Sequence, residues 1–175
     1  MSIHIVIDGY NLIRQSPTLS SIEGHSLEEG REALLQRLVS YKKAKHHPVT
    51  VVFDGTGADF FMEPKTRWKG IHVRFSRRGE LADSVIKRIA ARERERVLVV
   101  TSDREIADFT AKHGGATIDS QEFENKMNMA AYNDTNQTDL ADEEEEGWMP
   151  TTRKKGPSRR ISKRERKRRI RTRKL

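Results

Sequence analysis

Short runs of apolar, mostly β-branched residues alternate along the chain with longer segments in which apolar residues recur at helical spacing. The runs 3–7 and 49–53 do not alternate with polar residues, a pattern typical of strands that are buried on both faces of a sheet. The run 71–75 does alternate, and it predicts a strand with one wetter face. Further strands are predicted at 97–101 and 116–118.

Helices are predicted in most of the segments between these strands. The first begins at Ser26, which can exchange capping-box hydrogen bonds with Glu29, and its apolar stripe continues to about Ala44. The remaining predicted helices begin near Glu80, near Ile106 and near Gln121. Two segments without a clear period, 12–24 and 56–70, are predicted to be loops.

Alternating strands and helices predict an α/β fold for residues 1–131, with three layers and a mainly parallel central sheet. Right-handed crossovers would bring the carboxyl ends of the parallel strands to one edge of that sheet. From residue 132 onward the composition changes, with consecutive acids at 143–146 and a basic run from Arg153. Few apolar residues and dense like charge predict that residues 132–175 form a disordered tail.

The net charge of +8 is unevenly distributed along the chain. Residues 151–175 contain 14 Lys and Arg and a single acid, Glu165, whereas the first 150 residues contain 20 basic and 25 acidic residues. A strongly basic tail most often binds a polyanion, and nucleic acid is the commonest one. We therefore expect RNA contacts from the tail residues Arg153, Lys154, Lys155, Arg159 and Arg160.

Several classes of protein are disfavoured by what the sequence lacks. Without cysteine there is no disulfide framework or thiolate metal site, and a cytoplasmic location is expected. No apolar run approaches the roughly 20 residues of a membrane span, and a strand follows Met1 and Ser2 directly, so we expect no membrane partner and no signal peptide. Dinucleotide, Walker and nucleophile-elbow motifs are missing, so no organic cofactor is expected.

Acidic side chains follow three of the predicted strands, at Asp8, Asp54 and Asp103, and Glu80 and Asp83 begin the helix after another strand. On a parallel sheet these acids meet at one edge, where like charges repel by about 4 kcal/mol per close pair at intermediate dielectric. Either some of the acids are protonated or a cation binds. Carboxylate oxygens select Mg²⁺ or Mn²⁺, and such ions can activate water for phosphodiester hydrolysis.

Four motifs carry a resemblance to a known family: residues 5–13 (IVIDGYNLI), 51–54 (VVFD), 80–83 (ELAD) and 101–103 (TSD). In this order they resemble the NYN domain family, and most closely its YacP-like branch of PIN-like bacterial ribonucleases. The resemblance covers residues 3 to about 125. It implies a PIN-like sheet, divalent-metal-dependent cleavage of RNA and, in one branch, action on ribosome-associated messenger RNA.

The resemblance also implies roles for individual side chains. Asp8, Asp83 and Asp103 would be the metal-site acids, with Asn11 orienting a ligand and with Asp54 and Glu80 nearby. Each of these residues has a purely structural alternative. The acids can form turns, cap helices or complement helix dipoles, and Asn11 can bond the loop backbone.

A second set of residues is suited to RNA binding: Lys65, Arg67, Trp68, Lys69, Arg77 and Arg78. We expect them in loops on the acidic edge, where phosphates would have to pass. The structural alternative is a solvated basic surface. The ring of Trp68 is suited to stacking on a base, and its alternative is packing of the long loop.

Two hypotheses about function follow. In the first, the protein is a metal-dependent endoribonuclease whose tail recruits RNA or the ribosome. In the second, it is a non-catalytic RNA- or ribosome-binding module that uses the basic tail. The acids favour the first hypothesis, because a cluster of mutually repelling carboxylates in the cleft is not needed for RNA binding alone. Metal-dependent cleavage of DNA or of a flap structure is a third hypothesis.

Overall fold

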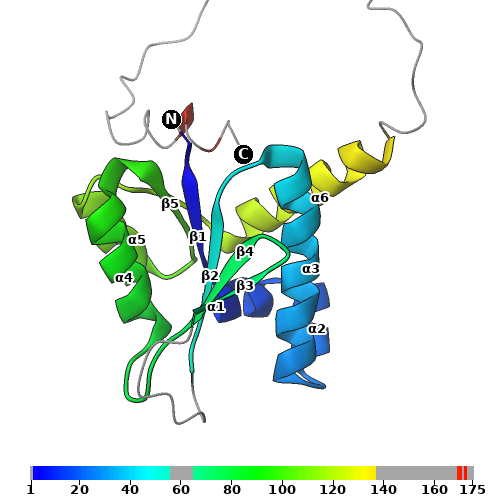
Figure 1. Cartoon of the computed structure of the whole chain (residues 1–175), viewed down its shortest axis with the longest axis horizontal. Coiled ribbons are helices and arrows are strands. Elements are labelled where there is room, and N and C mark those ends of the chain that lie inside the picture. Colours follow the sequence, from blue (N-terminus) through cyan, green and yellow to red (C-terminus); the bar gives the residue numbers. More distant parts are fainter. Residues whose placement is uncertain (1, 56–64, 137–168, 171, 173–175) are drawn as a thin grey trace, which may run out of the picture.

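A six-stranded sheet lies at the centre of the protein (Figure 1). The structure is a computed structural model that describes residues 2–55, 65–136, 169, 170 and 172. The strand order is β3-β4-β2-β1-β5-β6, and every neighbouring pair is parallel except β3 and β4. The strands are β1 (His4–Asp8), β2 (Val49–Phe53), β3 (Lys65–Trp68), β4 (Ile71–Phe75), β5 (Val97–Val100) and β6 (Ala116–Ile118).

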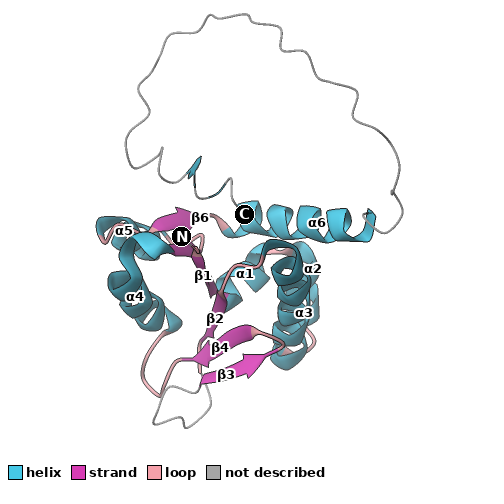
Figure 2. Cartoon of the chain, turned by 45° about the horizontal axis from the view of Figure 1, so that its top comes forward, coloured by secondary structure: helices cyan, strands magenta, loops and turns pink. Residues whose placement is uncertain are grey.

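Helices cover both faces of the sheet (Figure 2). One face carries α1 (Gly9–Gln15), α2 (Pro17–Glu23), α3 (Leu27–Lys45) and α6 (Ser120–Asn136). The other face carries α4 (Ala82–Glu93) and α5 (Arg104–Lys112), with the 3₁₀ turn η1 (Arg94–Arg96) between α4 and β5. The predicted three-layer α/β fold with a mainly parallel sheet is therefore confirmed.

The central strands are buried because both of their faces are apolar. Ile5 and Ile7 of β1 pack into the core under α1, α3 and α6, whereas Val6 between them packs into the core under α4 and α5. All three side chains are fully buried, and each such burial stabilises the fold by about 1.5–3 kcal/mol. The parallel register pairs Ile5 with Val49 of β2 and His4 with Val97 of β5.

Two short helices occupy the segment that the sequence predicts to be a loop. The Asp8 carboxylate caps α1, and Ser16 both ends α1 and caps α2, which has Pro17 in its first turn. Ser16-Pro17 is thus a helix junction. The apolar side chains of Leu12 and Leu19 hold these helices on the sheet, since both are fully buried.

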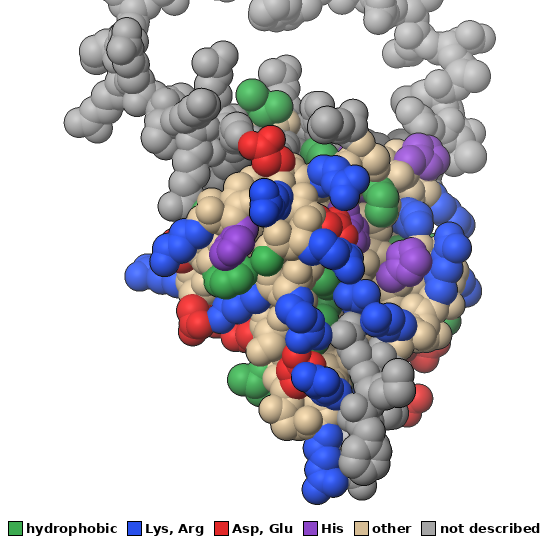
Figure 3. Space-filling model, turned by 60° about the vertical axis from the view of Figure 1, so that its left-hand side comes forward, with side chains coloured by type: hydrophobic (Ala, Val, Ile, Leu, Met, Phe, Trp, Pro, Cys, Tyr) green, Lys and Arg blue, Asp and Glu red, His purple; other side chains and the backbone are tan. Residues whose placement is uncertain are grey.

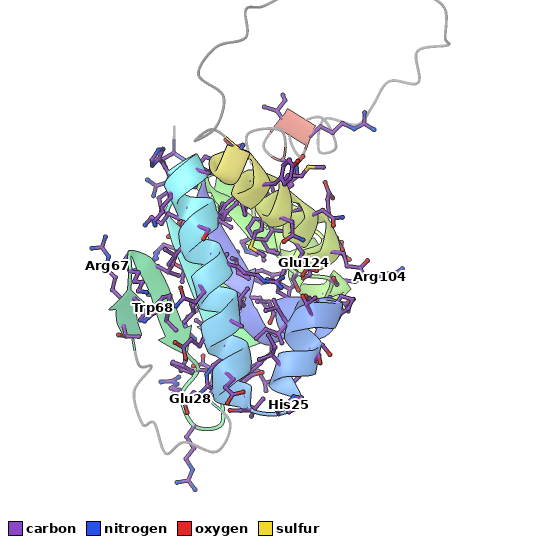
Figure 4. All side chains as sticks on the ribbon, turned by 90° about the vertical axis from the view of Figure 1, so that its right-hand side faces the viewer. His25, Glu28, Arg67, Trp68, Arg104 and Glu124 are labelled. Carbon is purple, nitrogen blue, oxygen red and sulfur yellow. The ribbon has the colours of Figure 1, made fainter. Side chains whose placement is uncertain are left out.

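A buried polar contact holds α6 against α2 and α3. The Glu124 carboxylate of α6 accepts hydrogen bonds from the Ser16 hydroxyl and from Arg37 Nη1, the latter at 3.0 Å. Figure 4 shows Glu124 on the side of α6 that faces these helices. The helix runs to Asn136, past the predicted end near residue 131. Among the described residues, no helix combines the length and apolar character needed to span a membrane.

Candidate active site

Asp8 is the acid at the centre of the sheet's carboxyl edge, because β1 lies between β2 and β5. Its side chain is buried. One carboxylate oxygen accepts a hydrogen bond from the Asn11 backbone amide at 3.3 Å, and the other accepts from the Thr101 hydroxyl at 3.5 Å. These bonds hold the carboxylate in place without neutralising its charge.

Asp103 and Asp83 approach this edge from two helix starts on the α4–α5 side. Asp103 caps α5, and a single oxygen, Oδ1, accepts from the amides of Glu105 at 2.7 Å and Ile106 at 3.3 Å. Its backbone amide donates to the Thr101 hydroxyl at 3.1 Å, which links this loop to the group that bonds Asp8. Asp83 lies in the first turn of α4 and is only partly buried.

The charges of these acids act on one another. Burial raises the pKa of Asp8 to about 6, with further increases from Asp83, Asp54 and Asp103, while the Asn11 amide opposes the shift. The pKa of Asp83 is also raised, first by burial and then by the negative charge of Asp103, whereas the positive charge of Lys87 lowers it. The winding of the chain therefore brings Asp54, Asp83 and Asp103, all predicted from the sequence, within electrostatic reach of Asp8.

The donor set of this edge suits a hard divalent cation. Asp8, Asp83 and Asp103 offer carboxylate oxygens, the ligands that Mg²⁺ and Mn²⁺ prefer, and their mutual repulsion would fall when a cation binds. Across residues 2–55, 65–136, 169, 170 and 172, no three His, Asp or Glu side chains are grouped closely enough to hold a metal ion together. Mg²⁺ usually keeps several of its waters, so binding partly through water fits this donor set.

Asp54 has a structural contact in addition to its charge. Its Oδ1 accepts a hydrogen bond from the Ala82 amide at 2.6 Å, at the start of α4. The residue at the N-cap of α4, Leu81, makes no side-chain capping bond, so Asp54 supplies the cap from the end of β2. Asp54 therefore has the structural role of a helix cap, whether or not it also contributes to a metal site.

Two substitutions separate the roles of Asp54. Asp54→Ala should lower the free energy of unfolding by about 1 kcal/mol, the usual loss when a helix cap is removed. Asp54→Asn retains an oxygen that can accept from Ala82 and should keep most of that stability. Urea denaturation of both variants beside Mn²⁺-binding titrations measures this difference. If Asp54→Asn lost Mn²⁺ binding at full stability, the carboxylate would be part of a metal site.

Asn11 connects the acidic edge to α6. Its Oδ1 accepts from the Ser102 amide at 2.9 Å and from the Ser120 hydroxyl at 2.7 Å. This contact fixes the loop that carries Asp103. An orienting role for Asn11 remains a prediction, and within this structure the group it orients is the protein's own loop.

Glu80 lies apart from the four aspartates in electrostatic terms. Its carboxylate pairs with Arg88 and, at 3.4 Å, with Arg77, and the hydrogen bond from Arg88 is the main reason that its pKa is lowered. The charges that raise the pKa of Asp8 do not include Glu80. The predicted metal role of Glu80 has no support from these contacts.

The structure corrects the expected placement of part of the basic set. Lys65–Trp68 form the edge strand β3 instead of a loop, and Trp68 pairs with Ile71, the first residue of β4. The hairpin tip with Lys69 therefore lies at the amino edge of the sheet, opposite the acids. Trp68 points toward α3 and packs against the core, whereas Arg67 points away (Figure 4). The contacts of Trp68 therefore fit a packing role, the structural alternative to base stacking.

Other members of that set stay near the acids or fall outside the structure. Arg77 and Arg78 follow the carboxyl end of β4 and line an open hollow of about 700 Å³ together with residues 79–81 and Ser84. The tail residues Arg153, Lys154, Lys155, Arg159 and Arg160 lie outside the described residues.

Three polar residues at this edge, Asp119, Ser120 and Lys87, were missed by the sequence reasoning. The Ser102 hydroxyl donates to Asp119 Oδ2 at 2.7 Å, and Ser120 bonds Asn11. Lys87 pairs with Glu105 beside Asp83. A usable signal existed for Asp119, since it follows β6 just as Asp103 closely follows β5. A signal also existed for Lys87, which follows Asp83 by four residues on α4, but its pairing with Glu105 of α5 could not be predicted from the sequence.

In the comparison with family models, residues 5–173 match the YacP-like NYN domain. The match extends well past residue 125, where the motif resemblance ends, and includes most of the basic tail. Among curated proteins, the uncharacterized protein YacP of Bacillus subtilis (strain 168) is 31% identical over 86 residues. This alignment covers 49% of the chain, which spans about half the length of that relative (50%).

Two crystal structures share the fold of the chain. The structure of Rae1 (YacP) from Bacillus subtilis aligns with a TM-score of 0.65 and 26% identity, covering 79% of this chain and 80% of that one. The structure of a mutant of the same Bacillus protein aligns with a TM-score of 0.62 and 24% identity, covering 74% and 77%. The match includes the greater part of each chain, so the sheet and its helices are common to both proteins.

Proposed function

The chain belongs to the YacP-like NYN domain family, and from this premise we propose that it is a divalent-metal-dependent endoribonuclease that hydrolyses phosphodiester bonds of RNA. The family as a whole is related to nucleases, which supports a nuclease-type hydrolase with an RNA substrate. The observation that carries the finer proposal is the position of Asp8 at the centre of one sheet edge, where burial first and then the charges of Asp83, Asp54 and Asp103 raise its pKa to about 6. An ionised cluster of this kind is unfavourable unless a cation is bound, and above about pH 6 Asp8 is mostly ionised.

In this proposal Asp8, Asp83 and Asp103 hold Mg²⁺ or Mn²⁺, directly or through water. When bound, such an ion lowers the pKa of an attacking water and offsets charge on the phosphate. Asp8 must release its proton before it can act as a ligand. The Thr101 hydroxyl fixes its orientation, and Asn11 keeps the Asp103 loop at the same edge.

The substrate strand would approach over the hollow lined by Arg77 and Arg78. Arg77 is already paired with Glu80, so it is held near the hollow before any phosphate arrives. Lys87, beside Asp83 and Asp103, is a further cation at the rim of the site. We propose that the basic tail recruits RNA, with the ribosome as a candidate carrier of that RNA.

The test of this proposal is a cleavage assay with RNA and DNA. The purified protein is incubated with single-stranded RNA and with DNA of matched sequence, with Mn²⁺ or with a chelator. Manganese-dependent cleavage of RNA is expected, with a loss on the order of 10²-fold or more in Asp83→Asn. Asp108→Asn, which changes an exposed aspartate on α5, is the matched control.

A different outcome would favour the alternative function. If the protein bound RNA but cleaved neither substrate with Mn²⁺, the endoribonuclease proposal would be wrong. The protein would then be a non-catalytic RNA- or ribosome-binding module, and deletion of residues 151–175 should abolish its binding. Preferential cleavage of DNA would instead change the substrate while leaving the metal chemistry in place.

A further inference from the structure

A second pocket lies at the amino edge of the sheet, on the face covered by α4. It measures about 480 Å³ and is bounded by the starts of β1 and β2, by strands β3 and β4, and by the last turn of α4 with η1. Its lining includes His4 and Pro48, which mark the amino ends of the strands. The aspartates follow the other ends of β1, β2 and β5, so the part of the pocket beside Arg92 and Arg96 lies about one strand length from them, about 16 Å for five residues. The pocket extends from there along β3 and β4 to Lys65 and Arg74, which are level with Asp8 in the sheet register.

The pocket is strongly cationic. Its lining contains four basic side chains, Lys65, Arg74, Arg92 and Arg96, and one carboxylate, that of Glu93. The carboxylate is already engaged, because Glu93 accepts from Arg92 Nη2 at 3.1 Å and lies 2.5 Å from His4 Nδ1. Lys and Arg side chains are numerous on the side of the molecule shown in Figure 3, which brings α4 and α5 forward.

The wall of the pocket is held by a chain of hydrogen bonds. Glu93 bonds one nitrogen of His4, and the other nitrogen, Nε2, lies 2.8 Å from the hydroxyl of the buried Thr50. This chain joins α4 to β1 and β2 across the pocket. Among the four cations, Arg92 is joined to this chain through Glu93, whereas Lys65 lies on β3, Arg74 on β4 and Arg96 in η1.

The imidazole of His72 reports that potential. His72 lies on β4 in the lining of the pocket. Its pKa is lowered by partial burial first and then by the positive charges of Arg67 and Lys42, with smaller contributions from His4 and Arg74. The burial disfavours a charge of either sign, whereas the contributions of the nearby cations indicate a positive potential, which favours an anion.

We infer that this pocket binds phosphate groups of the RNA strand whose scissile bond lies at the acidic edge. This inference rests on the proposed function. A phosphodiester chain places negative charges at regular intervals, so one strand can reach both sites, whereas a fragment shorter than the distance between them cannot. The pocket would add affinity for longer RNA without contacting the reacting atoms.

The double variant Arg92→Gln/Arg96→Gln tests this inference, with Lys112→Gln/Lys126→Gln as a control that removes the same charge outside the pocket. Binding of RNA of about 20 nucleotides and of about 2 nucleotides, the latter shorter than the separation, is measured by fluorescence anisotropy over a salt series. The pocket variant should bind the longer RNA on the order of 10-fold more weakly. The slope of log binding constant against log salt concentration should become shallower by about 1.4, because each of two lost phosphate contacts to a single strand contributes about 0.7. The control should change neither the affinity nor the slope.

The outcomes separate this inference from the proposed function. If the wild-type protein cleaves RNA and the pocket variant matches the control with both RNA lengths, the inference is overturned and the nuclease stands. If the length-dependent loss appears although the wild-type protein cleaves nothing, the pocket is supported and the nuclease is not. Adenosine monophosphate is the remaining probe. Tight binding of this nucleotide that is lost in the pocket variant, with RNA binding unchanged, would assign the pocket to a small phosphate compound and overturn the inference.

Discussion

Replacing Asp8 with asparagine is expected to abolish RNA cleavage and, in metal-free protein at pH 7, to raise the free energy of unfolding by up to about 3 kcal/mol. The first effect follows from the loss of a ligand at the centre of the carboxyl edge. The second follows from the cost of an ionised carboxylate that is buried among like charges. Burial is the largest cause of the raised pKa of Asp8, and Asp83, Asp54 and Asp103 add to it.

The sign of the stability effect follows from the two pKa values. The Asp8 pKa is about 6 in the folded state and 3.8 in the reference state, so the folded protein holds its proton more tightly. The stability that this gives is complete below about pH 4 and is lost as the pH rises through 6. Chemical denaturation with a chelator between about pH 4 and pH 8 should show this decline in the wild-type protein and a smaller one in Asp8→Asn.

Added Mn²⁺ should make the wild-type protein more stable to unfolding than Asp8→Asn. It binds the ionised cluster of the folded wild-type protein, which gains stability as the Mn²⁺ concentration rises, whereas Asp8→Asn gains little. Asp108→Asn should follow the wild-type protein in every condition. If Asp8→Asn were the less stable protein in chelator at pH 7, or if it still cleaved RNA, the carboxyl edge would not be a repulsive metal site.

The gathering of the acids could be predicted because it depends on topology alone. Asp8, Asp54 and Asp103 follow apolar runs that are typical of parallel strands, and parallel strands connected by helices must end at one edge. The contacts that give each acid its surroundings could not be predicted in this way. The bond from Ala82 to Asp54 joins residues 28 positions apart, and it exists only because α4 begins beside the end of β2.

The missed elements share a physical cause. Helices α1 and α2 have seven residues each, too short to show a helical period, and they are stable because Leu12 and Leu19 are buried on the sheet. Strand β3 has the sequence Lys-Thr-Arg-Trp, with little apolar signal, and it forms by pairing with β4 at the sheet edge. In both cases tertiary contacts override a weak local preference.

Gly9→Ala is expected to destabilise the fold by about 3 kcal/mol, the upper part of the range for an overpacked core. Gly9 begins α1 directly after Asp8, and a Cβ atom there would lie 2.3 Å from Cε1 of Phe53. Phe53 cannot retreat easily, because it is fully buried and its ring packs against Tyr10 at 5.2 Å and Phe75 at 5.7 Å between centroids.

The control for this prediction is Gly24→Ala. A Cβ at Gly24 meets only backbone oxygens at 3.4 Å or more, and its φ of −60° suits alanine, so its stability should be unchanged or slightly higher. The double variant Gly9→Ala/Phe53→Leu should recover part of the loss, since leucine leaves room where the ring stood. Urea denaturation of the single and double variants measures this coupling. Equal stability of the Gly9 and Gly24 variants would show that the glycine after Asp8 is there for another reason than its contact with Phe53.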